Sequence, residues 1–227
     1  MRDRILVVVA HPDDEILGCG GTISKKIKFD KAIVKTLILS KGIKARSNVK
    51  KLKQKLENNI HNAKKANQYL GVKFLEILDF PDNEFDKVSL LSIVKEIEKR
   101  VKDFKPNVIF THFSGDLNID HQITNRALIT ACRPVTNSTV QKIYAFEVSS
   151  STDWSFGSNK KLFYPNHFED ISKTIKKKIN SLKFYKNEMR KYPHSRSLKN
   201  VENLAKVRGS SVFKNYAEAF ILLRSIS

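Results

Sequence analysis

Short apolar runs alternate along the chain with longer stretches whose apolar residues recur at helical spacing. The apolar runs predict buried strands at residues 5–10, 32–39, 74–78, 107–111 and 143–146. Between them, the helical spacing predicts helices over residues 14–28, 49–70, 88–104 and 120–133. Strands that alternate with helices indicate an α/β fold, with a mostly parallel sheet covered by helices on both faces.

The last third of the chain departs from this alternation. Residues 149–170 show no clear period, which is typical of a long active-site loop. Residues 171–189 carry a basic amphipathic pattern that predicts a helix packed on the sheet, and residues 217–223 predict a final edge strand. Because no repeat or linker divides the chain, we expect residues 1–227 to form one domain, with residues 171–227 as its C-terminal helix and edge elements.

The charge balance changes the range of partners to consider. The chain has 42 basic and 23 acidic residues, a formal net charge of +19. Most of the basic residues are lysines spread from Lys25 to Lys214, which favours a solvated surface over a nucleic-acid interface rich in arginine and aromatic residues. A positive field would still help to attract a substrate that carries phosphate.

Two further features lead us to expect a cytoplasmic protein. No apolar run reaches the roughly 18 residues of a membrane span, and the N-terminal segment lacks the pattern of a signal peptide. The two cysteines, Cys19 and Cys132, form no CxxC pair, as is typical of a reducing compartment. Whether the chain forms a homo-oligomer leaves no mark in the sequence.

Candidate chemistry begins with the sequence HPDDE, residues 11–15, directly after the first predicted strand. In open α/β sheets, ligands bind beyond the carboxyl ends of the strands. Acids in a first helical turn are favoured by the helix dipole, but that explanation leaves His11 unused. A metal site uses all three side chains: His11 and Asp14 are suitable zinc ligands, and Asp13 beside them can take a proton from a water molecule.

A second cluster, THFSGDLNIDHQ, follows another predicted strand, so it lies on the same rim as His11. His121 is the natural third ligand, and Asp120 is best interpreted as the carboxylate that fixes the tautomer of a ligating histidine. A catalytic zinc ion then keeps one position open for water. Taken singly, His121, Asp116 and Asp120 can also be explained as first-turn or loop residues and helix caps.

At this point the sequence resembles a family. The segments AHPDDEILGCGGT, SKGIKAR, FPDN, DLNIDH and RGSSVFKNYAEAF are similar to those of the LmbE/PIG-L family of metal-dependent deacetylases. The resemblance implies a Rossmann-like domain, a Zn²⁺ ion and removal of an N-acetyl group from an amino sugar. It makes His11, Asp14 and His121 the zinc ligands and Asp13 the general base. EVSSSTDW and YPHSRS resemble a bacterial branch associated with glycan or surface-polysaccharide pathways.

The chain departs from the family at Asn118, where several members have a histidine that stabilises the oxyanion or protonates the amine. An asparagine donates a hydrogen bond but cannot deliver a proton at neutral pH. The acid must then be Asp13 acting twice, or a histidine such as His194 or His112. His194 lies in a predicted loop that can fold over the site, although an exposed loop histidine explains the sequence equally well.

Substrate specificity is expected from the surrounding loops. Arg46, Asn118 and Arg196 are the candidate contacts to a small molecule or sugar conjugate, and guanidinium groups pair well with phosphate or hydroxyl groups. Arg46 can equally be a surface residue, and Asp82–Asn83 can be a simple turn. The alternatives are a hydrolase of another amide or phosphoester, a different divalent ion such as iron or cobalt, or a non-catalytic basic binding protein with a structural metal. Because only three ligands are found, we favour an open, catalytic site.

Overall fold

The computed structural model describes residues 2–42, 49–136, 138–156 and 161–226. Its centre is a seven-stranded sheet with the strand order β3-β2-β1-β4-β5-β7-β6. The strands β1 to β5 are parallel, whereas β7 runs antiparallel to both β5 and β6. The bounds are β1 (Arg4–Val9), β2 (Ile33–Ser40), β3 (Phe74–Phe80), β4 (Val108–His112), β5 (Lys142–Phe146), β6 (His167–Asp170) and β7 (Ala217–Ser225).

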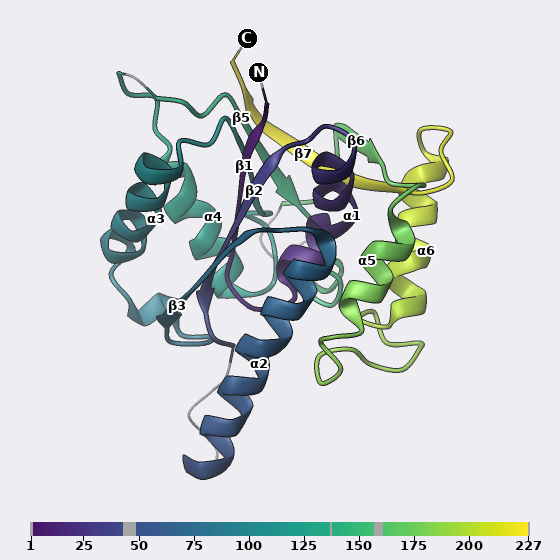
Figure 1. Ribbon diagram of the computed structural model, residues 1–227, viewed down its shortest axis with the longest axis horizontal. Coiled ribbons are helices and arrows are strands. Elements are labelled where there is room, and N and C mark those ends of the chain that lie inside the picture. Colours follow the sequence, from purple (N-terminus) through teal and green to yellow (C-terminus); the bar gives the residue numbers. More distant parts are fainter. Residues whose placement is uncertain (1, 43–48, 137, 157–160, 227) are drawn as a thin grey trace.

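Helices cover both faces of this sheet, as Figure 1 shows. They are α1 (Asp14–Lys28), α2 (Val49–Leu70), α3 (Leu90–Phe104), α4 (Ile119–Ala131), α5 (Ile175–Leu182) and α6 (Leu198–Ser210), with short 3₁₀ turns η1 (Phe85–Lys87) and η2 (Asp153–Ser155). The α/β fold with a mostly parallel sheet is therefore confirmed. No helix among the described residues is long and apolar enough to span a membrane.

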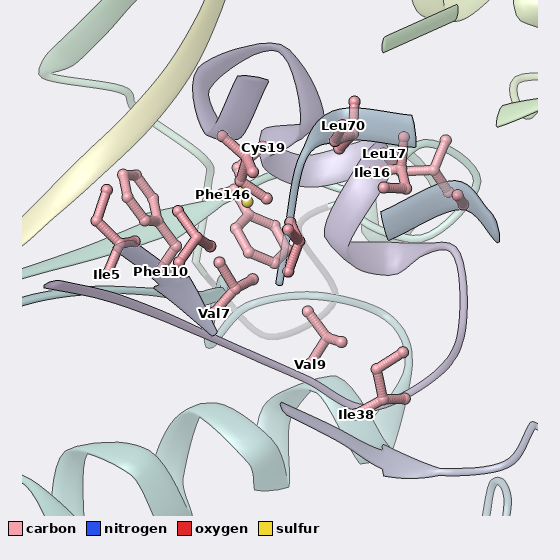
Figure 2. Packing of buried hydrophobic residues seen from close by; sticks show 14 of the residues in the cluster. Ile5, Val7, Val9, Ile16, Leu17, Cys19, Ile38, Leu70, Phe110 and Phe146 are labelled. Atoms are coloured by element: carbon pink, nitrogen blue, oxygen red, sulfur yellow. The ribbon is translucent and has the colours of Figure 1, made fainter. Parts of the chain in front are cut away.

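The alternation of side chains along β1 divides the core into two layers. Ile5, Val7 and Val9 point to the face covered by α1, α2, α5 and α6 (Figure 2). Leu6 and Val8 point to the opposite face, against α3 and α4. Because both faces of β1 are buried, its sequence is a continuous apolar run, and this is the reason that the strand could be predicted.

The C-terminal third differs from the prediction. The predicted helix 171–189 is wrong in extent, because α5 ends at Leu182 and the chain then continues in turns. The segment 149–170, predicted as one loop, contains η2 and the strand β6. Strand β7 is not an edge strand, since it pairs with β5 on one side and β6 on the other. The half-buried β6 has only four residues, too few to show an alternation.

Helix α1 has the predicted bounds but contains a kink that was not predicted. Cys19 has non-helical backbone angles, φ −144° and ψ 20°. Beside it, a Cβ at Gly18 would overlap the ring of Phe146, so glycine allows the helix to approach β5 closely. Gly18 of GCGGT therefore serves helix packing, and the glycines lie inside α1 rather than between a strand and a helix, where a phosphate loop would lie.

The topology brings the two candidate motifs together. Strands β1 and β4 are adjacent and parallel, with Ile5 paired to Val108 and Val7 to Phe110. Their carboxyl ends therefore lie on the same edge of the sheet, and the residues that follow β1 meet those that follow β4.

Candidate active site

The turn between β1 and α1 places three polar side chains at the rim of the sheet. Asp13 has a left-handed backbone conformation, with φ 99° and ψ −28°, just before α1 begins at Asp14. The backbone N–H of His11 donates a hydrogen bond of 3.0 Å to Oδ2 of Asp14. Asp13 and Asp14 are at most 1% exposed, so their charges require compensation within the protein.

Three side-chain atoms converge at the point where this turn meets α4. Nδ1 of His11 lies 3.3 Å from Nε2 of His121 and 3.4 Å from Oδ2 of Asp14. Nε2 of His121 lies 3.2 Å from the same Asp14 oxygen. Tetrahedral bonds of about 2.0–2.1 Å would separate neighbouring ligand atoms by about 3.3 Å. The three distances thus match three edges of a zinc-sized tetrahedron.

The other nitrogen of each imidazole faces a carboxylate. Nε2 of His11 is 3.0 Å from Oδ2 of Asp120, and Nδ1 of His121 is 3.3 Å from Oδ2 of Asp116. Such partners fix the tautomer of a ligating histidine and leave its remaining nitrogen free for a metal. Asp120 also accepts the backbone N–H groups of Asn83 and Phe85, at 2.6 and 3.0 Å, so it fixes the FPDN segment beside the site.

His112 lies next to these atoms but is already engaged. Its ring stacks on that of His121, with centroids 3.8 Å apart, and its Nε2 accepts the backbone N–H of Ala10 at 3.0 Å. Burial and the neighbouring His121 lower the pKa of His112 to about 3. His112 is therefore a neutral packing residue, which leaves three ligands in this set.

The electrostatics of the site favour a cation. Burial alone would lower the pKa of His11, but Asp120, Asp14 and Asp82 raise it to about 10. For His121, Asp14 and Asp116 likewise outweigh burial and raise the pKa to about 9. Within the described part of the chain, the buried Oδ1 of Asp14 has no hydrogen-bond partner. A carboxylate that has one unpartnered oxygen, and whose other oxygen lies among converging imidazoles, fits a divalent metal ion.

A polar cavity of about 220 Å³ opens beside the three ligand atoms. Its lining consists of His11, Pro12, Asp13, Gly42, Asn59, Asp82, Asn83, Asn118, Glu188 and Arg196. Nη1 of Arg196 lies 3.2 Å from Oδ2 of Asp13 and 3.8 Å from Oε2 of Glu188. Burial raises the pKa of Asp13 well above its ordinary value, and the charge of Arg196 opposes that shift. The carboxylate of Asp13 thus lines the cavity and is a candidate proton acceptor.

Comparison with known proteins agrees with this geometry. The family model PIG-L, described as GlcNAc-PI de-N-acetylase, matches residues 6–132, more than half of the chain. The chain belongs to the PIG-L family. A curated relative, the probable N-acetyl-alpha-D-glucosaminyl L-malate deacetylase 2 of Bacillus cereus, is 25% identical over 188 residues, which cover 80% of this chain and 82% of the relative.

Solved structures share the fold of this PIG-L family member at lower identity. The N,N'-diacetylchitobiose deacetylase from Pyrococcus horikoshii has a TM-score of 0.77 at 17% identity, over 98% of this chain and 84% of that one. GalB, the 4-carboxy-2-hydroxymuconate hydratase from Pseudomonas putida KT2440, has a TM-score of 0.78 at 16% identity, over 100% and 98%. Since one is a deacetylase and the other a hydratase, the fold alone does not determine the reaction.

The site residues predicted from the sequence lie in different places. His11, Asp14, Asp120 and His121 meet at one point, whereas Asp13 lines the adjacent cavity and pairs with Arg196. Arg196 and Asn118 line the cavity, but the Oδ1 atom of Asn118 also caps α4 by accepting the N–H of Asp120 at 2.8 Å. His194 is not among the described residues that line the cavity. Its Nδ1 accepts the backbone N–H of Arg196, and its ring packs on Trp154. Arg46 lies outside the described residues.

Several residues at the site were not predicted in these roles. Asp116 was considered only as a cap or loop acid, yet it pairs with His121 and accepts hydrogen bonds from Ser151 and Thr152. Asn59 and Glu188 line the cavity from α2 and from the segment after α5. Asp116 could have been found from its position in DLNIDH, but Asn59 and Glu188 carry no local sequence signal.

Proposed function

We propose that this chain is a metal-dependent hydrolase that removes the N-acetyl group from an amino sugar or sugar conjugate. The observation that carries the proposal is the set of three separations, 3.2, 3.3 and 3.4 Å, among His11 Nδ1, His121 Nε2 and Asp14 Oδ2. These residues would hold the ion, with zinc as the first candidate and another divalent transition metal as the alternative.

The relatives supply the reaction class. The family model is described as a de-N-acetylase of a glucosamine conjugate, and the named relatives include deacetylases of a glucosaminyl malate and of diacetylchitobiose. Their common chemical group is an N-acetyl amide on an amino sugar. We therefore infer the same linear amide as the substrate group of this chain, in a bacterial glycan or surface-polysaccharide pathway.

The bound ion would polarise the amide carbonyl and acidify water in the cavity. The residues of the chain then move the proton. Asp13 accepts it from the attacking water at Oδ1, because Oδ2 is paired with Arg196. The water oxygen forms a bond to the acetyl carbon. As the C–N bond breaks, the same proton passes to the leaving nitrogen, and the products are acetic acid, which ionises to acetate at neutral pH, and a free amine.

Asp13 is the best candidate for the proton donor as well. Asn118 cannot deliver a proton, and His112 stays neutral because its pKa is about 3. His194 is held by the backbone of Arg196 and by Trp154 and is not part of the described cavity lining. A carboxylate whose pKa is raised by burial is a stronger base than a free carboxylate, so it can accept a proton from water and return it to the leaving nitrogen.

The cavity lining supports a polyhydroxyl substrate. Its side chains include the amides of Asn59, Asn83 and Asn118, which both donate and accept hydrogen bonds. Among the described lining residues, Asp82 and Glu188 add acceptors and Arg196 adds a cation. This balance suits sugar hydroxyl groups better than a phosphate, so a phosphate on the substrate would lie outside the cavity.

The proposal is tested by reconstituting the purified protein with zinc, cobalt, iron or manganese and measuring acetate release. Substrates are free N-acetylated amino sugars, their nucleotide diphosphate forms, diacetylchitobiose and N-acetylglucosaminyl malate. We expect metal-dependent acetate release from at least one substrate, and release that is slower on the order of 10²-fold or more from the Asp13→Asn variant. Phosphate release instead of acetate would favour the phosphoester alternative. A fully loaded protein that releases neither product, but binds nucleic acid in a salt-dependent way, would favour the non-catalytic alternative.

A further inference from the structure

The third acid of HPDDE, Glu15, has no role in the reaction described above, yet it is fully buried, with 0% of its surface exposed. It does not line the described cavity, so it touches neither substrate nor the proposed ion. A carboxylate in such a position is costly unless its oxygens are hydrogen-bonded. Its partners therefore indicate what it does.

The partners of Glu15 come from three separate parts of the chain. Oε2 accepts the backbone N–H of Asp13 at 3.1 Å. Oε1 accepts Nδ2 of Asn67 in α2 at 2.8 Å and the hydroxyl of Tyr185, after α5, at 2.6 Å. Asn67 and Tyr185 are 1% and 2% exposed, so all these bonds are shielded from water.

The bond to Asp13 holds a strained residue. A φ of 99° is disfavoured for any residue except glycine, and it persists only where the surroundings enforce it. The carbonyl of Asp13 is also fixed, since it accepts the N–H groups of Ile16 and Leu17. With both its N–H and its C=O held, the backbone of Asp13 is fixed in a position from which its carboxylate lines the cavity and pairs with Arg196.

The carboxylate of Glu15 also connects the walls of the cavity to the turn between β1 and α1, which contains Asp13. Helix α2, which provides Asn67, also provides the lining residue Asn59. The carbonyl of Tyr185 accepts the backbone N–H of Glu188, another lining residue, at 2.9 Å. One buried group thus connects the proposed base, Asp13, to two walls that would hold the substrate.

We infer that Glu15, together with Asn67 and Tyr185, is a positioning clamp that holds Asp13 in its strained conformation and sets it relative to the substrate walls. The inference rests on the proposed function, because it assigns the clamp to the proton transfer by Asp13. A displacement of about 1 Å at a reacting group can cost on the order of 10²-fold in rate.

The test removes one bond of the clamp while it keeps the packing. Tyr185→Phe deletes the hydroxyl, and Tyr69→Phe is the matched control, since Tyr69 lies on α2 with a long contact of 3.5 Å to Asn180. We expect Tyr185→Phe to lower kcat about 10-fold or more, with KM within about twofold and metal content unchanged, whereas Tyr69→Phe retains the activity of the unmodified protein. Glu15→Gln should retain more kcat than Glu15→Ala, because the amide oxygen can still accept the N–H of Asp13.

Three outcomes would overturn the inference: a kcat of Tyr185→Phe equal to that of Tyr69→Phe, a loss explained by lost metal or lost folded protein, or a change in KM alone. A second readout needs no substrate. Amide hydrogen exchange at Asp13 should be slow in the unmodified protein and fast in Glu15→Ala, and equal exchange in both would also overturn the clamp. If the unmodified protein releases no acetate, the proposed function fails separately, and the exchange measurement still decides whether Glu15 holds Asp13.

Discussion

Helix α1 is flanked by two buried polar clusters, which differ in whether their buried charges are balanced within the protein. At its kink, the N–H groups of Gly21 and Thr22 donate to Glu218, and Nζ of Lys178 donates to both Glu218 and the carbonyl of Leu17. At its first turn, the buried Oδ1 of Asp14 finds no hydrogen bond among the described residues, and imidazole nitrogens face one another. We call the first group, Gly21, Thr22, Lys178 and Glu218, the kink cluster. We call the second group, His11, Asp13, Asp14, Asp116, Asp120 and His121, the site cluster.

The difference shows how the chain uses buried charge. In the kink cluster, the charge of Lys178 is balanced by Glu218, and the N–H groups of Gly21 and Thr22 and the carbonyl of Leu17 are paired, so no charge is left for a ligand to compensate. In the site cluster, carboxylates exceed the cations that the protein supplies, and the ligand atoms already have metal-like spacing. A cluster that is incomplete within the chain is the better candidate for function.

The sharpest way to separate the two clusters is Asp13→Asn. We expect acetate release to fall on the order of 10²-fold or more, because Asn accepts no proton, while metal content and far-UV circular dichroism stay unchanged. Asp103→Asn, a change on the exposed surface of α3, is the matched control and should leave the rate as it is. Full activity in Asp13→Asn would exclude Asp13 as the base.

Lys178→Met should instead lower the stability of the protein and leave its activity unchanged. Removing one member of a buried ion pair leaves the other charge uncompensated, so we expect the free energy of unfolding in urea to fall by about 3 kcal/mol. Metal binding and acetate release per folded molecule should be unaffected, because Lys178 contacts α1 beyond its first turn. The control is Lys176→Met on the exposed side of α5. Equal destabilisation by both variants would mean that the pair does not stabilise the kink.

The two clusters were not equally open to prediction from sequence. The site cluster lies in HPDDE and DLNIDH, each a short motif at the end of an apolar run, so strand periodicity alone placed both at one rim of the sheet. Its ligands could be named because metal chemistry restricts residue types. Their proximity in space follows from the pairing of β1 with β4, the two strands between which the order of this doubly wound sheet reverses.

The kink cluster left no comparable sign. Glu218 is 197 residues from Gly21 and 40 from Lys178, so no local pattern relates them. Strand β6 and helix α6 were missed for a similar reason, because a four-residue strand and a helix with few buried residues carry weak periodicity. The role of Asp116 depends on the side chains of Ser151 and Thr152, which only the folded chain brings near it.

Asp116 belongs to the site cluster, but its oxygens accept hydrogen bonds from within the protein, as those of Glu218 do in the kink cluster. It therefore tests whether a carboxylate that is already hydrogen-bonded still contributes to metal binding. Asp116→Asn keeps one of the two oxygens that accept from Ser151 and Thr152 and removes the charge that faces Nδ1 of His121. We expect metal affinity to fall about 10-fold to 100-fold in a competition titration with a chelator. Asp153→Asn, which alters a neighbouring hydrogen bond to Ser195, is the control. Unchanged affinity would mean that Asp116 only orders its loop.

The smallest effect on stability is expected at the last turn of α1. There, Lys25 and Lys26 pair with Glu169 closer to solvent than Lys178 pairs with Glu218. Burial would raise the pKa of Glu169, but the hydrogen bonds and charges of His167, Lys25 and Lys26 lower it to about 2. The unfolded chain, with an ordinary value near 4.5, binds the proton first as the pH falls. The contribution of Glu169 to stability is therefore complete above pH 4.5 and is lost as the pH falls toward 2. Glu169→Gln should flatten this part of the stability curve, while Glu202→Gln on α6 should leave it unchanged. Because water screens partly exposed ion pairs, Glu169→Gln should lower the free energy of unfolding less than Lys178→Met does. A larger loss would show that burial does not determine how much such an ion pair stabilises the protein.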